Sequence, residues 1–178
     1  MRTQCTAWLI VCAMCSAAAE AQAADDACDG FRWDIGHERA LFATTAEALP
    51  AGVAPESAPT VLPDRLYEMP VTPQGEVKFP LPPGKKTLTD AGSAGLAHLR
   101  VASAGDYRIS IDQAFWIDVV ADHQLLPAKD FQGRPGCQAP HKIVLYSLPA
   151  GQDLMLQFSG ASGSRLQLTI TAVAPSPR

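Results

Sequence analysis

The chain has few basic residues, and they form no long run. It contains 14 Lys and Arg against 18 Asp and Glu, a formal net charge of −4, and its longest basic run is Lys85-Lys86. Proteins that bind nucleic acid or an anionic membrane surface concentrate Lys and Arg in one segment or on one face. The sequence therefore argues against both classes of partner.

A long apolar segment is also missing. A membrane-spanning helix needs about 20 consecutive apolar residues, whereas the longest apolar run here covers only residues 7–19. Arg2 precedes this run, and small residues at A-x-A spacing follow it, at 19–21 and 21–23. These features are typical of a secretory signal peptide. We expect residues 1–23 to be a signal cleaved after Ala23 (or after Ala21 or Ala24), no membrane span, and a periplasmic or secreted product.

Cysteine is scarce once this signal is removed, because only Cys28 and Cys137 remain of the five. Two cysteines in an exported chain most simply form one disulfide, which here would close a loop of about 110 residues. Cys137 lies in FQGRPGCQAPHK, residues 131–142. The alternative is a Cys2His2 metal site made of Cys28, His37, Cys137 and His141. No compact C-x2-C spacing is present, so we favour the disulfide and expect no metal or cofactor.

No long helical pattern occurs, and short segments of period two dominate the chain from residue 65 onward. We expect eight strands, at 66–71, 76–79, 95–101, 106–112, 115–121, 142–148, 154–159 and 165–172. Turn residues separate them. The sequence therefore predicts an all-β fold, an antiparallel, jelly-roll-like β-sandwich over residues 65–174 with one disulfide.

The alternation also predicts which side chains are buried. Each strand is expected to bury one face and expose the other, with 142–148 placed centrally because it is apolar on both faces. The stretches 99–111 and 144–158 share an Ala-Gly pair between two strands, which suggests two hairpins. Residues 24–64 are expected to form an extension packed on the sandwich, with a short helix capped by Asp34 and a proline-rich loop at 50–64.

Several short motifs carry a resemblance to a known family. They are the 28–33 segment, DYRIS at 106–110 after Ala104-Gly105, WIDVV at 116–120, Gly136-Cys137, PHKIV at 140–144, LPAG at 148–151 and Ser159-Gly160. With these motifs most of the mature chain resembles a family of small exported proteobacterial proteins that are largely uncharacterised. More distantly the sandwich is similar to pre-peptidase C-terminal and jelly-roll modules. The resemblance to these modules implies that the protein is an accessory domain.

Some members of that family carry the label homogentisate 1,2-dioxygenase. The resemblance would then imply a non-haem iron held by two histidines and a carboxylate. The histidines of this chain are His37, His98, His123 and His141, and no two of them lie at a short H-x-H spacing. An export signal is also foreign to a cytoplasmic catabolic enzyme. The residues therefore do not favour this activity.

A candidate ligand face lies on the polar sides of the strands around residue 112. It combines Trp116 and Asp118 with Arg108, Asp112 and His98, and Arg100 lies beside them. An exposed tryptophan flanked by charged groups can stack on a sugar ring while those groups bind the hydroxyls. In the alternative interpretation the 50–64 loop covers Trp116, and Arg108 pairs with Asp118.

These observations predict a non-catalytic binding or accessory domain of the periplasm. Its partner would be an unidentified periplasmic protein or a small ligand. Binding of a carbohydrate or another small ligand at the Trp116 face is the second hypothesis, and the iron dioxygenase is the third. The cysteine and histidine of the 131–142 segment are expected to have no catalytic role, because the disulfide would consume the thiol.

Overall fold

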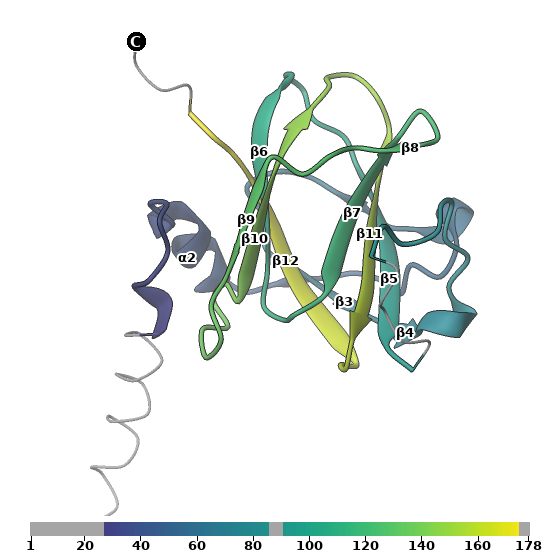
Figure 1. Ribbon diagram of the computed structural model, residues 1–178, viewed down its shortest axis with the longest axis horizontal. Coiled ribbons are helices and arrows are strands. Elements are labelled where there is room, and N and C mark those ends of the chain that lie inside the picture. The colour runs from purple at the N-terminus through teal and green to yellow at the C-terminus, as the bar shows by residue number, and fades with distance from the viewer. Residues whose placement is uncertain (1–26, 86–90, 175–178) are drawn as a thin grey trace, which may run out of the picture.

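Two β-sheets packed face to face form the body of the protein (Figure 1). A computed structural model describes residues 27–85 and 91–174. The first sheet has the strand order β1 (Glu47–Ala48), β3 (Tyr67–Pro70), β12 (Arg165–Ala172), β6 (Gly105–Ile111), β10 (Lys142–Leu148) and β9 (Asp130–Gly133). The second has the order β2 (Thr60–Val61), β5 (Ser93–Leu99), β11 (Leu154–Ala161), β7 (Trp116–Ala121) and β8 (Gln124–Leu125), and β4 (Thr72–Pro73) also pairs with β5.

The pairing of the main strands is nested. The outermost pair in sequence is β3 with β12, followed by β5 with β11, β6 with β10, and β7 with β8, and all four pairs are antiparallel. Successive pairs alternate between the two sheets. This winding is that of a jelly roll of eight strands. The predicted fold class is therefore confirmed, although the short strands β1 and β2 pair in parallel and make both sheets mixed.

The space between the sheets is filled by apolar side chains. The strands contribute alternate residues to one cluster, and its fully buried members include Ile109, Leu156, Phe158 and Ile170. Phe115, just before β7, is buried in the same cluster. Removal of this much apolar surface from water is the main stabilising contribution to such a fold. Among the described residues the space between the sheets is a packed apolar core.

Chain segments outside the sandwich cover both outer faces. The N-terminal part, with helix α2 (Gly36–Phe42), lies on the outer side of the first sheet (Figure 1). On the second sheet the backbone of residues 52–53 bonds to Leu96 and Lys78, and Phe79 and Leu81 pack on a small cluster that contains Leu96 and Met155. Two 3-10 turns, Pro55–Ser57 and Gln74–Glu76, lie in these covering segments.

Several local predictions were wrong. Residues 76–79 form no strand, because Gln74–Glu76 is a 3-10 turn. The stretches 99–111 and 144–158 are not hairpins, since each Ala-Gly pair connects one sheet to the other. Strand β10 lies next to β9, the strand at the edge of its sheet, and is therefore not central. The short strands β1, β2, β4, β8 and β9 were not predicted.

The prediction that every outer face is exposed also fails. Ser110, Thr169 and Thr171 on the first sheet and Gln157 and Ser159 on the second are buried. The covering segments exclude water from these polar side chains. The predicted extension over residues 24–64 does pack on the sandwich where it is described, and the predicted signal at 1–23 lies outside the described residues.

Candidate functional site

Helix α2 places an acidic side chain against the first sheet. The helix has seven residues and starts after Ile35 rather than after Asp34, but the Asp34 carboxylate still accepts a hydrogen bond from the Gly36 N–H at 2.9 Å. Glu38 follows in the first turn and is turned toward the sheet, where only 2% of its side chain remains exposed. A carboxylate buried to this degree requires partners that offset its lost hydration.

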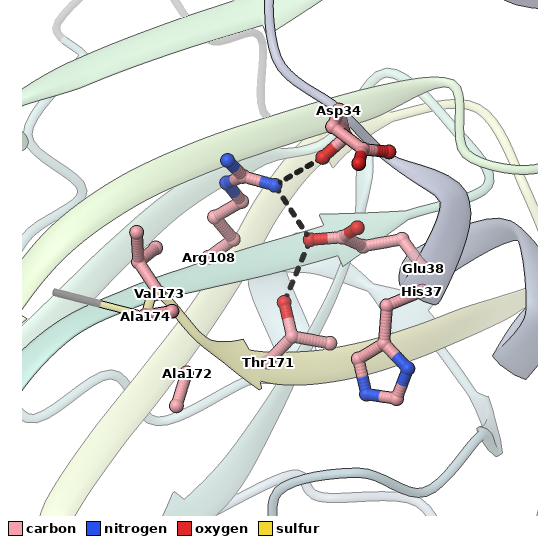
Figure 2. A pocket seen from close by; sticks show the side chains of 8 residues that line it. All are labelled: Asp34, His37, Glu38, Arg108, Thr171, Ala172, Val173 and Ala174. Carbon is pink, nitrogen blue, oxygen red and sulfur yellow. Dashed lines mark hydrogen bonds and ion pairs between the residues drawn. The ribbon is translucent and has the colours of Figure 1, made fainter. Parts of the chain in front are cut away.

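Arg108 and Thr171 supply these partners. They lie opposite each other on the neighbouring strands β6 and β12. Arg108 Nη1 donates to Glu38 Oε1 at 3.2 Å and to the backbone oxygen of Asp34 at 2.7 Å, and Thr171 Oγ1 donates to the same Glu38 oxygen at 2.7 Å (Figure 2). The guanidinium carbon of Arg108 also lies 5.2 Å from the centroid of the Trp33 ring. One buried ion pair thus connects the helix to two strands.

The cluster is not fully satisfied within the described chain. Glu38 Oε2 and Arg108 Nε are buried and have no hydrogen-bond partner there. A cleft of about 130 Å³ opens beside them, and its lining residues are Asp34, His37, Glu38, Arg108, Thr171, Ala172, Val173 and Ala174. His37 Nε2 lies 2.8 Å from Asp64 Oδ1. A polar cleft next to unsatisfied buried charges is the strongest candidate site that the described residues offer.

The five residues predicted for one ligand face lie in separate places. Arg108 lines the cleft on the first sheet, whereas Trp116 and Asp118 lie on β7 of the second sheet. The expectation that the strands on either side of residue 112 share one polar face was wrong, because β6 and β7 belong to different sheets. Asp112 follows β6 and accepts a hydrogen bond from the Gln167 N–H at 2.9 Å, and its burial raises the pKa of the carboxyl group.

Trp116 and Asp118 do lie together, as predicted. Trp116 Nε1 donates to Asp118 Oδ1, and the Gly84 N–H donates to Asp118 Oδ2, both at 2.9 Å. The ammonium groups of Lys85 and Lys142 lie 5.6 and 5.1 Å from the centroid of the Trp116 ring. The segment that lies over Trp116 and Asp118 contains Gly84 and Lys85, so the alternative in which the 50–64 loop covers Trp116 was wrong. The pairing of Arg108 with Asp118 was also wrong, because Arg108 pairs with Glu38.

Lys142, beside this tryptophan, has a lowered pKa. Its ammonium group donates to the Phe115 carbonyl at 2.9 Å. Burial, assisted by the nearby charge of Lys85, lowers the pKa of Lys142 to about 8. Tyr146 donates its hydroxyl to the Ile117 carbonyl at 2.8 Å, and burial raises the pKa of that phenol. Each of these two groups thus donates a hydrogen bond to a backbone carbonyl of the fold.

His98 lies apart from both clusters, on the outer side of β5. Its Nε2 lies 2.9 Å from the Pro55 carbonyl. It lines a second hollow of about 320 Å³, together with Thr60, Leu62, Leu99, Arg100 and Asp153. Arg100 and Asp153 form an exposed ion pair at the rim. Exposed ion pairs of this type contribute little free energy to stability.

The two cysteines form the predicted disulfide. The Cys28 and Cys137 sulfurs are 2.05 Å apart, and the bridge anchors the N-terminal segment beside β9. The alternative Cys2His2 metal site is therefore wrong, because both thiolates are consumed. Its two histidines have other contacts, His37 with Asp64 and His141 Nδ1 with the Cys137 carbonyl at 3.2 Å. The described residues contain no group of three potential metal ligands.

The residues do not fit the iron site of a dioxygenase either. His37, His98 and His141 bond to groups at the outside of the sandwich. His123 lies in the exposed turn between β7 and β8 with a φ of 60°. Among the described residues no two histidines and a carboxylate converge as a facial triad requires.

Sequence reasoning missed Glu38 as a site residue. It assigned Glu38 to the short helix but had no signal that this side chain is buried, because acidic residues are common in exposed first turns. Only the docking of α2 on β12 reveals the pair with Arg108.

No family model matches the chain, and no curated protein matches it. The resemblance to the exported proteobacterial family therefore stays a prediction. No helix within the described residues has the length and hydropathy needed to cross a membrane.

Proposed function

We propose that this protein is an exported, non-catalytic binding domain that takes a small ligand in the cleft beside Arg108. The observation that carries the proposal is the buried Glu38–Arg108 pair with hydrogen-bonding capacity left over beside an open cleft. The jelly roll serves as the rigid scaffold, and α2 with the Cys28–Cys137 bridge completes the site.

The energetics of the pair support a role beyond stability. Moving two charges out of water costs several kcal/mol per ion, and well-packed apolar residues of similar volume are often as stabilising as a buried pair. A fold whose core is otherwise apolar does not need Glu38 and Arg108 for its cohesion. Ten buried side-chain polar atoms have no partner within the described chain, and two of them, Glu38 Oε2 and Arg108 Nε, belong to residues that line the cleft. A ligand bound in the cleft would supply a reason to keep this buried pair.

The rest of the fold supports a binding role at this surface cleft. The interior between the sheets is filled, so a ligand has no room there. Cys137 is in a disulfide and cannot act as a nucleophile. Export is supported by the disulfide, which persists in oxidising compartments, together with the predicted signal at 1–23.

The carbohydrate hypothesis at Trp116 receives less support. Two ammonium groups already lie near that ring, and its N–H is bonded to Asp118. A sugar would have to displace at least one lysine before it could stack. Titration of glycans against tryptophan fluorescence should therefore give no saturable change.

A fragment screen monitored by two-dimensional NMR tests the proposal. We expect binders whose chemical-shift changes map to Arg108, His37 and Val173 at the cleft. The hollow at His98 serves as an internal comparison, because it is larger but has only an exposed ion pair at its rim. Binders that map only to that hollow, or no binder at all, would contradict the assignment of the cleft. A pull-down from periplasmic extract separates a protein partner from a small ligand.

A further inference from the structure

We propose that Lys142 is a covalent modification site, whose amine forms an imine with a small aldehyde that carries a carboxylate group. The inference goes beyond the proposed function and does not depend on it, because Lys142 does not line the cleft beside Arg108. In the reaction the nitrogen lone pair of the neutral amine attacks the carbonyl carbon. A carbon–nitrogen double bond replaces the carbon–oxygen double bond, and both amine protons leave with the oxygen as water.

The side chain of Lys142 starts on the inner face of the first sheet. Lys142 is the first residue of β10, and Val144 and Tyr146, which follow at every second position, belong to the apolar core. Its ammonium group reaches the other sheet, where it donates to the Phe115 carbonyl at 2.9 Å, just before β7 (Figure 1). A lysine that crosses the end of an apolar core loses part of its hydration, which disfavours the charged form.

The charges around the amine act in the same direction. The ammonium groups of Lys142 and Lys85 lie 5.1 and 5.6 Å from the centroid of the Trp116 ring. Asp118 opposes this repulsion, but its two oxygens already accept hydrogen bonds from Trp116 and Gly84. Burial and the charge of Lys85 outweigh Asp118 and lower the pKa of Lys142 to about 8. A desolvated amine beside a second cation is the arrangement that activates a nucleophilic lysine.

One flank of the Lys142 side chain is open to a small molecule. Gly133, on the edge strand β9, lies directly opposite Lys142, and residues paired in this way carry their side chains on the same face. Apart from its neighbours in the chain, a Cβ atom at Gly133 would have only the His141 carbonyl oxygen within 4 Å, at 3.9 Å. Lys142 itself is half-buried, and Phe131, on the same face of β9, is 64% exposed. The missing side chain at position 133 therefore leaves an approach with an apolar border.

Lys85 selects the class of aldehyde. This lysine is exposed, and among the described residues its ammonium group has the Trp116 ring as a contact but no ion pair or hydrogen bond. It can pair with the carboxylate of a reagent whose aldehyde carbon has reached Lys142. The two ammonium groups lie beside one ring, so the two ends of the reagent must be close together. Glyoxylate, with its aldehyde and carboxylate on adjacent carbons, is the smallest such compound.

Reductive trapping tests the inference on the unaltered mature protein. The protein is incubated with glyoxylate or acetaldehyde and with cyanoborohydride, whose hydride converts an imine into a stable secondary amine. Peptide mass spectrometry then gives the yield of adduct at each lysine. The exposed Lys78 is the internal reference, because the ratio of the yields at Lys142 and Lys78 removes the intrinsic reactivity of each aldehyde.

The expected ratios follow from the state of the two amines. An ordinary exposed lysine has a pKa of about 10.4, so at about pH 8 a far larger fraction of Lys142 is neutral. Its lower basicity offsets part of this gain, and with glyoxylate we expect a yield at Lys142 about 10-fold above that at Lys78. With acetaldehyde, which cannot pair with Lys85, the ratio should be about 3-fold smaller.

Two variants test the role of Lys85. In Lys85→Met the preference of Lys142 for glyoxylate over acetaldehyde should disappear, and this comparison is insensitive to any change in the basicity of Lys142 because both aldehydes meet the same amine. Lys129→Met removes an exposed lysine that pairs with Asp106 and is the matched control, so it should retain the preference.

Each remaining outcome would contradict part of the inference. Equal yields at Lys142 and Lys78 with both aldehydes would show that Lys142 is an ordinary lysine and would overturn the covalent site. A ratio as large with acetaldehyde as with glyoxylate, or a preference for glyoxylate that persists in Lys85→Met, would overturn the carboxylated class. Because the first comparison uses the unaltered protein, a variant that fails to fold does not remove the test.

Discussion

Glu38 Oε1 lies 3.2 Å from Arg108 Nη1, although the two residues are 70 positions apart in the sequence. Only 2% of the Glu38 side chain and 16% of the Arg108 side chain are exposed. This contact joins the N-terminal helix to the sandwich through two charges that are largely removed from water.

Removal of one charge from this pair should be costly. Glu38→Gln leaves the Arg108 guanidinium buried without its counterion, and we expect the free energy of unfolding to fall by about 3 kcal/mol. The double variant Glu38→Leu with Arg108→Met should regain most of this loss. Urea unfolding measures the free energy of unfolding of the single and the double variant. Glu47→Gln, in the exposed pair with Arg65, is the control and should change stability by less than about 1 kcal/mol. Equal effects at the two sites would contradict the buried-pair interpretation.

The disulfide should contribute strongly through the unfolded state. Cys28 and Cys137 are 109 positions apart, and a cross-link of that span is worth on the order of 4–5 kcal/mol in the chain-entropy model. We expect the variant Cys28→Ala with Cys137→Ala to unfold at a correspondingly lower urea concentration. The intact protein in reducing agent should behave in the same way. A loss below about 1 kcal/mol would show that the unfolded chain is not constrained by this bridge.

Lys142 should make stability depend on alkaline pH. Its pKa is about 8 in the folded protein and about 10.5 in the unfolded chain. Between these values the unfolded state binds more protons, so the free energy of unfolding should rise with pH from about 8 to 10. Above pH 10 the raised pKa of Tyr146 acts in the opposite sense, because the unfolded phenol ionises first.

Urea unfolding at several pH values checks the Lys142 prediction. The rise should be absent in Lys142→Met, which cannot titrate. Lys78→Met removes an exposed lysine and controls for the lost positive charge. If the free energy of unfolding of Lys142→Met still rose with pH, other titrating groups would be its cause.

Gly52 should not tolerate a side chain. A Cβ atom there would lie 1.8 Å from the Leu96 carbonyl oxygen, in the segment whose backbone bonds to Leu96. Gly52→Ala must move this segment off the second sheet, and we expect a loss of about 2 kcal/mol or more. Gly75 has open space around its Cβ position, so Gly75→Ala should change stability by at most about 0.5 kcal/mol. Thermal unfolding compares the two, and a tolerated Gly52→Ala would mean that this contact is loose.

Much of the fold could be predicted from the local pattern of apolar and polar residues in the sequence. The predicted strands at 142–148 and 165–172 match the observed β10 and β12, because a continuous apolar run in the first and clear alternation in the second both indicate a strand. The short strands escaped prediction, since β1, β2, β4 and β8 have only two residues and β9 only four, too few to show a period. The 76–79 segment failed for a related reason, as its apolar residues pack on the second sheet without joining it.

The candidate site followed from the sequence only in part. Arg108 was named from its place on a polar strand face, and Trp116 and Asp118 were correctly expected to be neighbours on β7. Their assignment to one face assumed that successive strands pair, whereas the jelly roll sends β6 and β7 to different sheets. Sheet membership depends on contacts between distant strands, which the alternation of one strand does not encode.

The sequence by itself determined the class of the protein. The spacing of apolar residues gave the strands, and the scarcity of cysteine outside the predicted signal left one possible disulfide, Cys28 with Cys137. Only the tertiary structure decided which polar residues are buried together. Glu38 and Arg108 meet because α2 docks across β12 and β6, and the desolvation of their charges is a property of that docking, which neither residue nor its neighbours in sequence specify.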